Sequence, residues 1–263
     1  MSSRVGMAHS LLRLGAFIQS LSVVVMKPDD LVEFSRQGYS NPGDVESWAE
    51  DTLVDSGLNA EELALLAEIP ATQGNLLLLG VGGGREAIPL AHMGFQVTGV
   101  DFVAAMVDRA KENAFRRGVS IEGLVQEISQ LEVPANAFDI VWLSREIYSC
   151  VPTRARRVEM LRRIKCALKP GGFLICQFRM DPEFRLTGKG LLIRRLVALC
   201  TLGNLAYEPG DTLWLNIEFV HAFDSPEAIQ AEIEEGGLSV VKMQTDRSPF
   251  RCGAVCKKSL DTS

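Results

Sequence analysis

The chain has 263 residues, of which 47% are hydrophobic and 23% charged, the composition of a globular protein long enough for one sizeable domain. A net charge of −6 and a pI near 5.3 exclude the basic surface typical of nucleic-acid binding, so no nucleic-acid partner is expected. Six dispersed cysteines without a C-x-x-C pair, beside three histidines, predict no metal site and indicate a reducing, cytoplasmic location.

Residues 1–27 form an extension before the expected domain. The stretch 11–26, LLRLGAFIQSLSVVVM, is apolar, but it contains Arg13 and Gln19 and is shorter than the ~20 residues of a spanning helix. An A-x-A-like cleavage site is missing, so a signal peptide has weak support. We expect an unstructured or helical extension without stable membrane insertion. A start at Met26 and a loose amphipathic helix are the alternatives.

Residues 28–73 are expected to form a helical cover. Helices are predicted at 29–37 and 45–53, separated by the turn-rich SNPGD. Asn59 precedes a third helix as its N-cap, and Glu62 stands three residues later, which is the capping-box spacing.

From residue 74 to about 260, strands and helices alternate. The expected strands cover 76–80, 96–100, 121–126, 138–143 and 173–179, and the helices cover 85–93, 103–117 and 153–168. Lys169-Pro170-Gly171-Gly172 is expected to stop the last of these helices and turn the chain. This alternation predicts a doubly wound α/β fold, with a mostly parallel sheet and helices on both faces.

An insertion at 181–212 separates the fifth strand from the remaining elements. Its apolar segment 191–202 fits a substrate lid, a homodimer helix or a membrane-touching patch, and we expect a helix packed on the domain. A strand at 213–222 should follow, then a helix at 225–236 that is started by Asp224 or Ser225 and has Pro226 at its first position. Strands near 238–245 and 250–257 should complete the sheet.

The first strand leads into a glycine-rich turn, Gly80-Val81-Gly82-Gly83-Gly84, and the second ends at Asp101. Glycines permit positive φ and close approach of a ligand to the backbone, and an ionised carboxylate can accept from two ribose hydroxyls. Counted from Gly80, the small third residue of a dinucleotide fingerprint is replaced by Arg85. An offset register ending at Ala87 satisfies that fingerprint, so an NAD(P)-linked oxidoreductase stays an alternative.

Five blocks in order resemble the class I S-adenosylmethionine (SAM) methyltransferase family. They are NLLLLGVGGGREAIPLA, FQVTGVDF, VQEISQLEVPANAFDIVWLS, MLRRIKCALKPGGFLICQF and FDSPEAIQAEIEEGGLSVVKM. The chain departs from the family at Leu78, where an acidic residue often stands. The resemblance implies a seven-stranded sheet with one antiparallel strand near the C-terminus, SAM as the cofactor, and the 28–73 cover over the mouth of its pocket.

The resemblance also implies the SAM contacts. Gly80, Gly82 and Gly84 should let the methionine part lie against the backbone, and Asp101 should bind the ribose. An N-cap role is the alternative for Asp101. The other expected contacts are Phe102 on the adenine face, Glu127 and Ile128 at the adenine edge, and Ser144 and Tyr39 at the methionine end.

Transfer from a sulfonium requires mainly positioning of the acceptor and exclusion of water, with a base if the acceptor arrives protonated. Candidates for catalysis are Glu146 and Tyr148 after the fourth strand, and His221. The expected function is methyl transfer from SAM to a small-molecule acceptor, with the apolar insertion favouring a hydrophobic one. A non-catalytic SAM-binding or scaffold protein is the second alternative.

Overall fold

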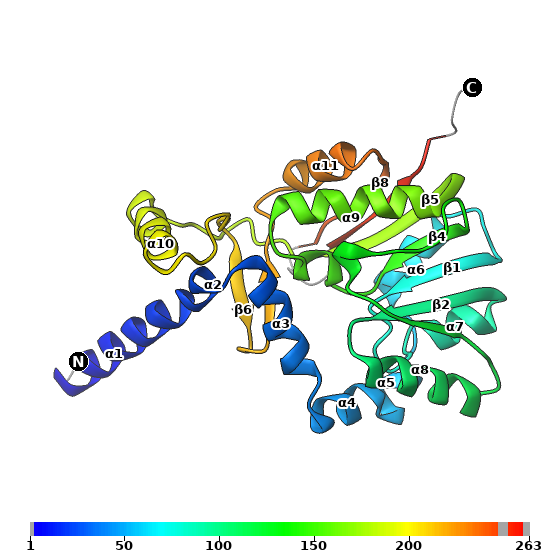
Figure 1. Cartoon of the computed structure of the whole chain (residues 1–263), viewed down its shortest axis with the longest axis horizontal. Helices are drawn as coiled ribbons and strands as arrows, with labels where there is room; N and C mark the ends of the chain where they lie inside the picture. Colours follow the sequence, from blue (N-terminus) through cyan, green and yellow to red (C-terminus); the bar gives the residue numbers. More distant parts are fainter. Residues whose placement is uncertain (1–2, 247–251, 260–263) are drawn as a thin grey trace.

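A seven-stranded sheet forms the centre of the chain, for which the computed structural model describes residues 3–246 and 252–259 (Figure 1). The order is β3-β2-β1-β4-β5-β9-β8, and β9 alone runs antiparallel to its neighbours. This confirms the predicted fold class. The strands are β1 (Gly74–Leu79), β2 (Phe95–Asp101), β3 (Glu122–Val125), β4 (Phe138–Leu143), β5 (Leu168–Phe178), β8 (Ser239–Gln244) and β9 (Cys252–Lys257).

Helices cover both faces of the sheet because successive strand residues point to opposite sides. Leu76 and Leu78 of β1 pack in one buried cluster with residues of α6, α7 and α8. Leu77 and Leu79 pack in another with residues of α9 and α11. The run of four leucines therefore supplies two cores at once. These helices are α6 (Ala60–Ala67), α7 (Ala87–His92), α8 (Ala104–Arg116), α9 (Arg154–Ala167) and α11 (Pro226–Glu235).

Two helix starts follow the capping residues identified in the sequence. The Asn59 side chain accepts from the Glu62 amide, and the Glu62 carboxylate accepts from the Asn59 amide, each at 2.8 Å. Ser225 caps α11 by accepting from the Ala228 amide, with Pro226 as the first helical residue. Side-chain acceptors satisfy amides that lack partners within the helix, which fixes these two boundaries.

The prediction of a single strand at 213–222 is wrong. The segment forms a hairpin of β6 (Asp211–Trp214) and β7 (Glu218–His221), separate from the main sheet. The reversal occurs at Leu215 and Asn216, both with positive φ (+48° and +60°). Leucine rarely adopts this conformation, so the turn lacks the usual glycine signal.

Other differences are local. The helix expected at 45–53 is divided at Glu50, whose extended ψ of 136° separates α4 (Pro42–Ala49) from α5 (Asp51–Asp55). Strand β5 begins at Leu168, so the Lys169-Pro170-Gly171-Gly172 turn lies within it, opposite a register shift between Phe138 and Ile140. Short 3₁₀ turns, η1 (Ile128–Gln130) and η2 (Ile147–Cys150), follow β3 and β4. The expected strand residues 250–251 and extension residues 1–2 lie outside the described residues.

The N-terminal helices and the insertion meet beside the sheet domain (Figure 1). Val23 and Val24 of α2 are buried with Leu31, Ala198 and Phe219. Among the described residues, 4–25 is the one helical stretch long and apolar enough, by length and composition, to cross a membrane. The elements of this region are α1 (Ser3–Ser20), α2 (Ser22–Val25), α3 (Pro28–Tyr39) and α10 (Gly188–Thr201).

Candidate functional site

A cavity of about 480 Å³ opens where β1, β2, β3 and β4 end, within the usual range for small-molecule sites of about 300–1,000 Å³. Two groups of residues line it, and we call the second the insertion wall because its hairpin directly follows the 181–212 insertion. The turn wall consists of Gly80, Gly82, Asp101, Phe102, Glu127 and Ile128, from the strand ends. The insertion wall consists of Val32, Ser35 and Tyr39 of α3 with Trp214, Glu218 and Val220 of the β6–β7 hairpin.

The glycine turn needs its glycines for two different reasons. Gly80 (φ +84°) and Gly82 (φ +48°) line the cavity, and a Cβ on Gly80 would lie 2.7 Å from Ile147 Cγ1. Gly84 (φ +98°) lies off the cavity, where a Cβ would approach Ile88 and Ala110 within about 3.5 Å. Gly80 and Gly82 thus expose backbone to a ligand, whereas Gly84 permits close helix packing.

Asp101 is buried at the end of β2 and bridges the turn to the next helix. Its Oδ2 accepts from the Gly82 amide at 3.1 Å, and its Oδ1 accepts from the Val103 amide at 3.0 Å. Burial raises its pKa to about 6, against the lowering effect of these hydrogen bonds. Because each carboxylate oxygen has a second lone pair, Asp101 can still accept from a ligand in the cavity.

The other residues expected at the SAM contacts also line the cavity, apart from Gly84. Glu127 accepts from the amide and the hydroxyl of Ser129, at 2.8 and 2.6 Å, and so caps η1. The Phe102 ring has the Arg36 guanidinium 5.7 Å from its centre. Cavity-lining Ile128 begins η1.

Ser144 ends a buried polar chain that runs behind the turn. Its hydroxyl donates to Glu86, which pairs with Arg85, and Arg85 also pairs with Glu62 of α6. All four side chains are buried. Arg85, the residue that breaks the dinucleotide fingerprint, therefore joins the N-terminal cover to the glycine turn.

Two carboxylates face the cavity on the side of the insertion. The Tyr39 hydroxyl donates to Glu218 at 2.8 Å, and burial raises the pKa of Glu218. Glu146, after β4, also lines the cavity. Burial raises its pKa to about 7, with Arg179 and Arg145 acting in the opposite direction. A carboxylate of this pKa is suited to take a proton near neutral pH.

The structure does not bring Tyr148 or His221 to this cavity. Tyr148 is fully buried and donates to Glu232 at 2.8 Å, because η2 turns its ring into the core. His221 Nδ1 lies 2.8 Å from Asp211 Oδ1 across the hairpin. Both are thereby removed from the acceptor side, and Glu146 alone of the three catalytic candidates lines the cavity.

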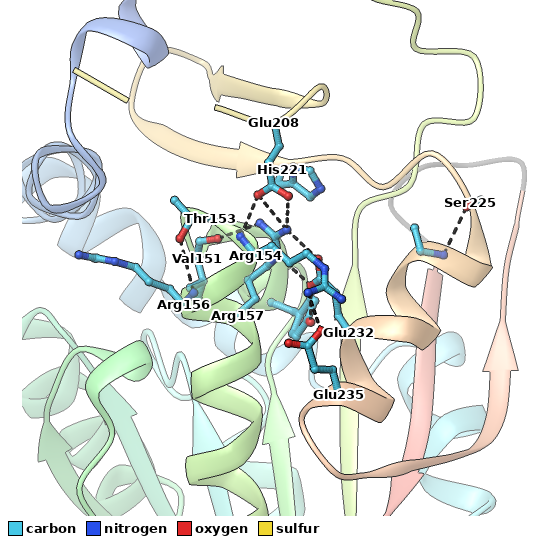
Figure 2. A network of polar contacts seen from close by, with 12 residues as sticks. Val151, Thr153, Arg154, Arg156, Arg157, Glu208, His221, Ser225, Glu232 and Glu235 are labelled. Atoms are coloured by element: carbon cyan, nitrogen blue, oxygen red, sulfur yellow. Dashed lines mark hydrogen bonds and ion pairs between the residues drawn. The ribbon is translucent and has the colours of Figure 1, made fainter. Parts of the chain in front are cut away.

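A buried arginine connects the hairpin region to the sheet domain (Figure 2). Arg157 of α9 donates to both oxygens of Glu232 on α11, at 2.9 and 2.8 Å, and to both oxygens of Glu208, at 3.1 and 3.2 Å. Glu208, Asp211 and His221 are close enough to bind a metal ion in principle. The Glu208 carboxylate already accepts from Arg157, Asp211 accepts from the Glu208 backbone amide at 2.9 Å, and His221 Nδ1 lies beside Asp211, so this cluster is an anchor for the insertion.

Sequence reasoning missed several lining residues, among them Trp48, Cys150, Gln177, Trp214 and Glu218. Glu218 and Val220 alternate along β7, a period-two signal that becomes readable once the hairpin is recognised. Cys150 and Gln177 lie after β4 and near the end of β5, where strand ends meet.

Comparisons with known proteins agree with this geometry. Residues 76–172 match the family model described as "Methyltransferase domain". The Ubiquinone biosynthesis O-methyltransferase of Paramagnetospirillum magneticum is 33% identical over 168 residues, 64% of this chain and 60% of that protein. The protein of the same name from Maricaulis maris is 28% identical over 68% of this chain and 65% of its own length. The chain thus spans less than two thirds of either relative.

Solved structures share the fold. A SAM-dependent methyltransferase from Methanosarcina mazei superposes with a TM-score of 0.59 at 19% identity, over 78% of this chain and all of that one. The CcbJ methyltransferase of Streptomyces caelestis gives 0.62 at 18% identity, over 86% of this chain and 99% of its own.

Proposed function

We propose that the chain is a class I SAM-dependent methyltransferase that methylates a hydroxyl group on a small, apolar acceptor; residues 76–172 match a methyltransferase family model, and the fold is that of solved SAM-dependent methyltransferases. One observation carries the proposal: a single cavity joins Gly80, Gly82 and Asp101 to the carboxylates of Glu146 and Glu218. A nucleoside site and a proton acceptor thus share one cavity. The name of the two bacterial relatives supports oxygen as the accepting atom.

The turn wall fits SAM by the chemistry of its donor and acceptor groups. Gly80 and Gly82 present backbone without side chains, and Asp101 offers carboxylate lone pairs for two ribose hydroxyls. We assign the adenine end to Phe102, Glu127 and Ile128. Ser144 and Tyr39 then belong to the methionine end. Gly84 acts on this site only through the packing of the turn.

We assign proton removal to Glu146. SAM, when bound, supplies an activated methyl group, so the residues of this chain need only orient the acceptor and take its proton. With SAM bound, the Glu146 carboxylate, whose pKa is about 7, would accept the hydroxyl proton while the acceptor oxygen bonds to the methyl carbon and the methyl–sulfur bond breaks, so that S-adenosylhomocysteine leaves. Glu218, held by Tyr39, orients the hydroxyl from the other wall.

The insertion wall supports an apolar acceptor. Val32, Trp214 and Val220 contribute hydrocarbon surface beside Glu218, and burial of such groups favours an apolar ligand by about 25 cal/mol per Å². The enclosed contacts also exclude water from the reacting atoms. A cytoplasmic location is part of the proposal, supported by six dispersed cysteines without a C-x-x-C pair.

The test is calorimetric titration with SAM, S-adenosylhomocysteine and NADH, followed by transfer of labelled methyl groups to a panel of apolar hydroxyl compounds. We expect binding of both sulfur ligands, their loss in Asp101→Ala, and labelled product. Binding of NADH alone would overturn the cofactor assignment. Tight SAM binding without labelled product from any acceptor would favour the scaffold alternative over the enzyme.

A further inference from the structure

Helices α1 and α10 expose an apolar surface away from the cavity. On α1, Met7, Leu11, Leu14 and Ile18 follow a 4-3-4 spacing that places them on one face, and each is more than half exposed. On α10, Leu192, Leu196 and Leu199 repeat the pattern and are also more than half exposed. Large contiguous apolar patches are uncommon on soluble proteins and mark interaction surfaces.

The two helices belong to one region of the molecule. Arg194 of α10 donates to the Ser20 hydroxyl of α1 at 2.8 Å, and its guanidinium lies 6.0 Å from the centre of the Phe17 ring. Helix α10 also packs on α2. Figure 1 shows α1 projecting from the sheet domain, with α10 on the same side of the molecule. We call these two helices the docking face.

The charge of the docking face is opposite to that of the protein. The segments 3–26 and 184–206 contain six basic residues and no acidic ones, in a chain whose formal net charge is −6. They are Arg4, Arg13, Arg185, Lys189, Arg194 and Arg195. Basic residues beside exposed leucines are complementary to an anionic lipid surface.

We propose that α1 and α10 bind the surface of an anionic lipid bilayer, with α1 lying in the interface. A spanning orientation is disfavoured for two reasons. Arg13 stands near the middle of the apolar stretch 4–25, where a charged side chain opposes insertion into the hydrocarbon core of a bilayer. Val23 and Val24, near the end of that stretch, are buried in the protein and unavailable to lipid.

The docking face connects directly to the cavity. Val24 of α2, Leu31 of α3 and Phe219 of β7 share one buried cluster. The next residues along these elements, Val32 and Val220, line the cavity. Docking therefore holds the insertion wall near the bilayer, where apolar acceptors concentrate. The lipid contact itself does not depend on the proposed activity.

The experiment is co-sedimentation of the full chain with vesicles of phosphatidylcholine alone or mixed with phosphatidylglycerol. We expect binding to the mixed vesicles, weakened by salt. The double variant Leu11→Glu/Leu14→Glu should lose about a hundredfold in vesicle affinity, because two leucines no longer enter the interface. Removing the charges in Arg13→Gln/Lys189→Gln/Arg195→Gln should weaken mixed-vesicle binding by about fivefold per charge.

Phe115→Glu is the matched control, since Phe115 is 82% exposed on α8, away from the docking face. It should bind vesicles as the wild type does. Both leucine positions are exposed, so circular dichroism and SAM binding should be unchanged and exclude misfolding as the cause. Equal binding to both vesicle types, or unaltered binding by the leucine variant, overturns the proposal.

Two further measurements distinguish surface binding of lipid from self-association through the docking face and from membrane insertion. Sedimentation equilibrium without lipid should give a monomer. Self-association that the leucine variant abolishes, without vesicle binding, would assign the face to a second copy of the chain. An alkaline carbonate wash should release the wild-type protein from vesicles. Retention through the wash would overturn the surface orientation of α1.

Discussion

The two walls of the cavity are built by different means. The turn wall consists of residues at the ends of parallel strands, held by backbone hydrogen bonds such as those from Gly82 and Val103 to Asp101. The insertion wall consists of side chains from α3 and a separate two-stranded hairpin. Its link to the domain is a buried ionic network around Arg157 (Figure 2).

This difference separates the part of the cavity whose geometry the fold fixes from the part whose geometry can vary. Strand ends are fixed by the register of the sheet, so the ligand groups there follow from the fold. The hairpin can change shape without disturbing the sheet, because its strands pair only with each other. We infer that the first wall sets the cofactor and the second selects the acceptor.

The largest effect on catalysis without an effect on cofactor binding should appear at Glu146, which lines the cavity but belongs to neither group of wall residues. Glu146→Gln should lower kcat by about 10²–10⁴, because the acceptor proton loses its base, while SAM affinity stays within about twofold. In the wild type the rate should rise as the pH passes about 7, since the carboxylate acts only when deprotonated. Stopped-flow or quenched single-turnover assays across pH measure both effects.

Glu183→Gln serves as the control for Glu146→Gln, because Glu183 is exposed and lies off the cavity lining. It should keep the wild-type rate and pH profile. An unaltered pH profile in Glu146→Gln would transfer the base role to Glu218 and place proton removal on the insertion wall.

The ionic anchor should be the largest single contribution to the stability of the insertion. Arg157→Met leaves Glu232 and Glu208 without their shared cation, and breaking a buried pair in this way costs about 3–5 kcal/mol. Urea unfolding should report that loss. Arg162→Met on the same helix is the control: its ion pairs are half exposed and should contribute less than about 1 kcal/mol. Equal losses in both would contradict the anchor.

The sequence was informative where local pattern and fold agree. The glycine turn, Asp101 and the caps at Asn59 and Ser225 each depend on a few neighbouring residues, and the structure has these features where expected. Glu218 was missed because its position depends on a reversal at Leu215–Asn216, which lacks a glycine.

The predicted catalytic residues show a second limit of sequence reasoning. Glu146 and Tyr148 are two residues apart, yet the 3₁₀ turn η2 sends one toward the cavity and the other into the core. Side chains alternate between the two faces of β7. Glu218 and Val220 point into the cavity, so His221, the next residue, points away from it. Spacing alone could not reveal either outcome without the local backbone conformation.

On the turn wall, Asp101→Ala should weaken SAM binding by about 10–150-fold, the range for a lost hydrogen bond to a charged group. Asp101→Asn keeps one acceptor and should lose less. Wild-type affinity should fall as the pH drops through about 6, because a protonated Asp101 no longer accepts from two hydroxyls. Calorimetry at several pH values measures this, and a pH-independent affinity in the wild type would contradict the role.

The smallest expected effects concern helix caps, and they test whether the insertion unfolds together with the sheet domain. Ser225→Ala removes the cap of α11, which packs on the core through Ile229 and Ile233, so about 1 kcal/mol should be lost from global unfolding. Thr187 caps α10, since its side chain accepts from the Gly190 amide at 3.1 Å, and Thr187→Ala removes this cap. Helix α10 buries only Arg194 and Ala198. Loss of the Thr187 cap should therefore appear as faster amide exchange confined to α10, with urea unfolding nearly unchanged. A full loss of global stability in Thr187→Ala would instead mean that the insertion folds as one cooperative unit with the sheet, and the independent unfolding of the insertion would be refuted.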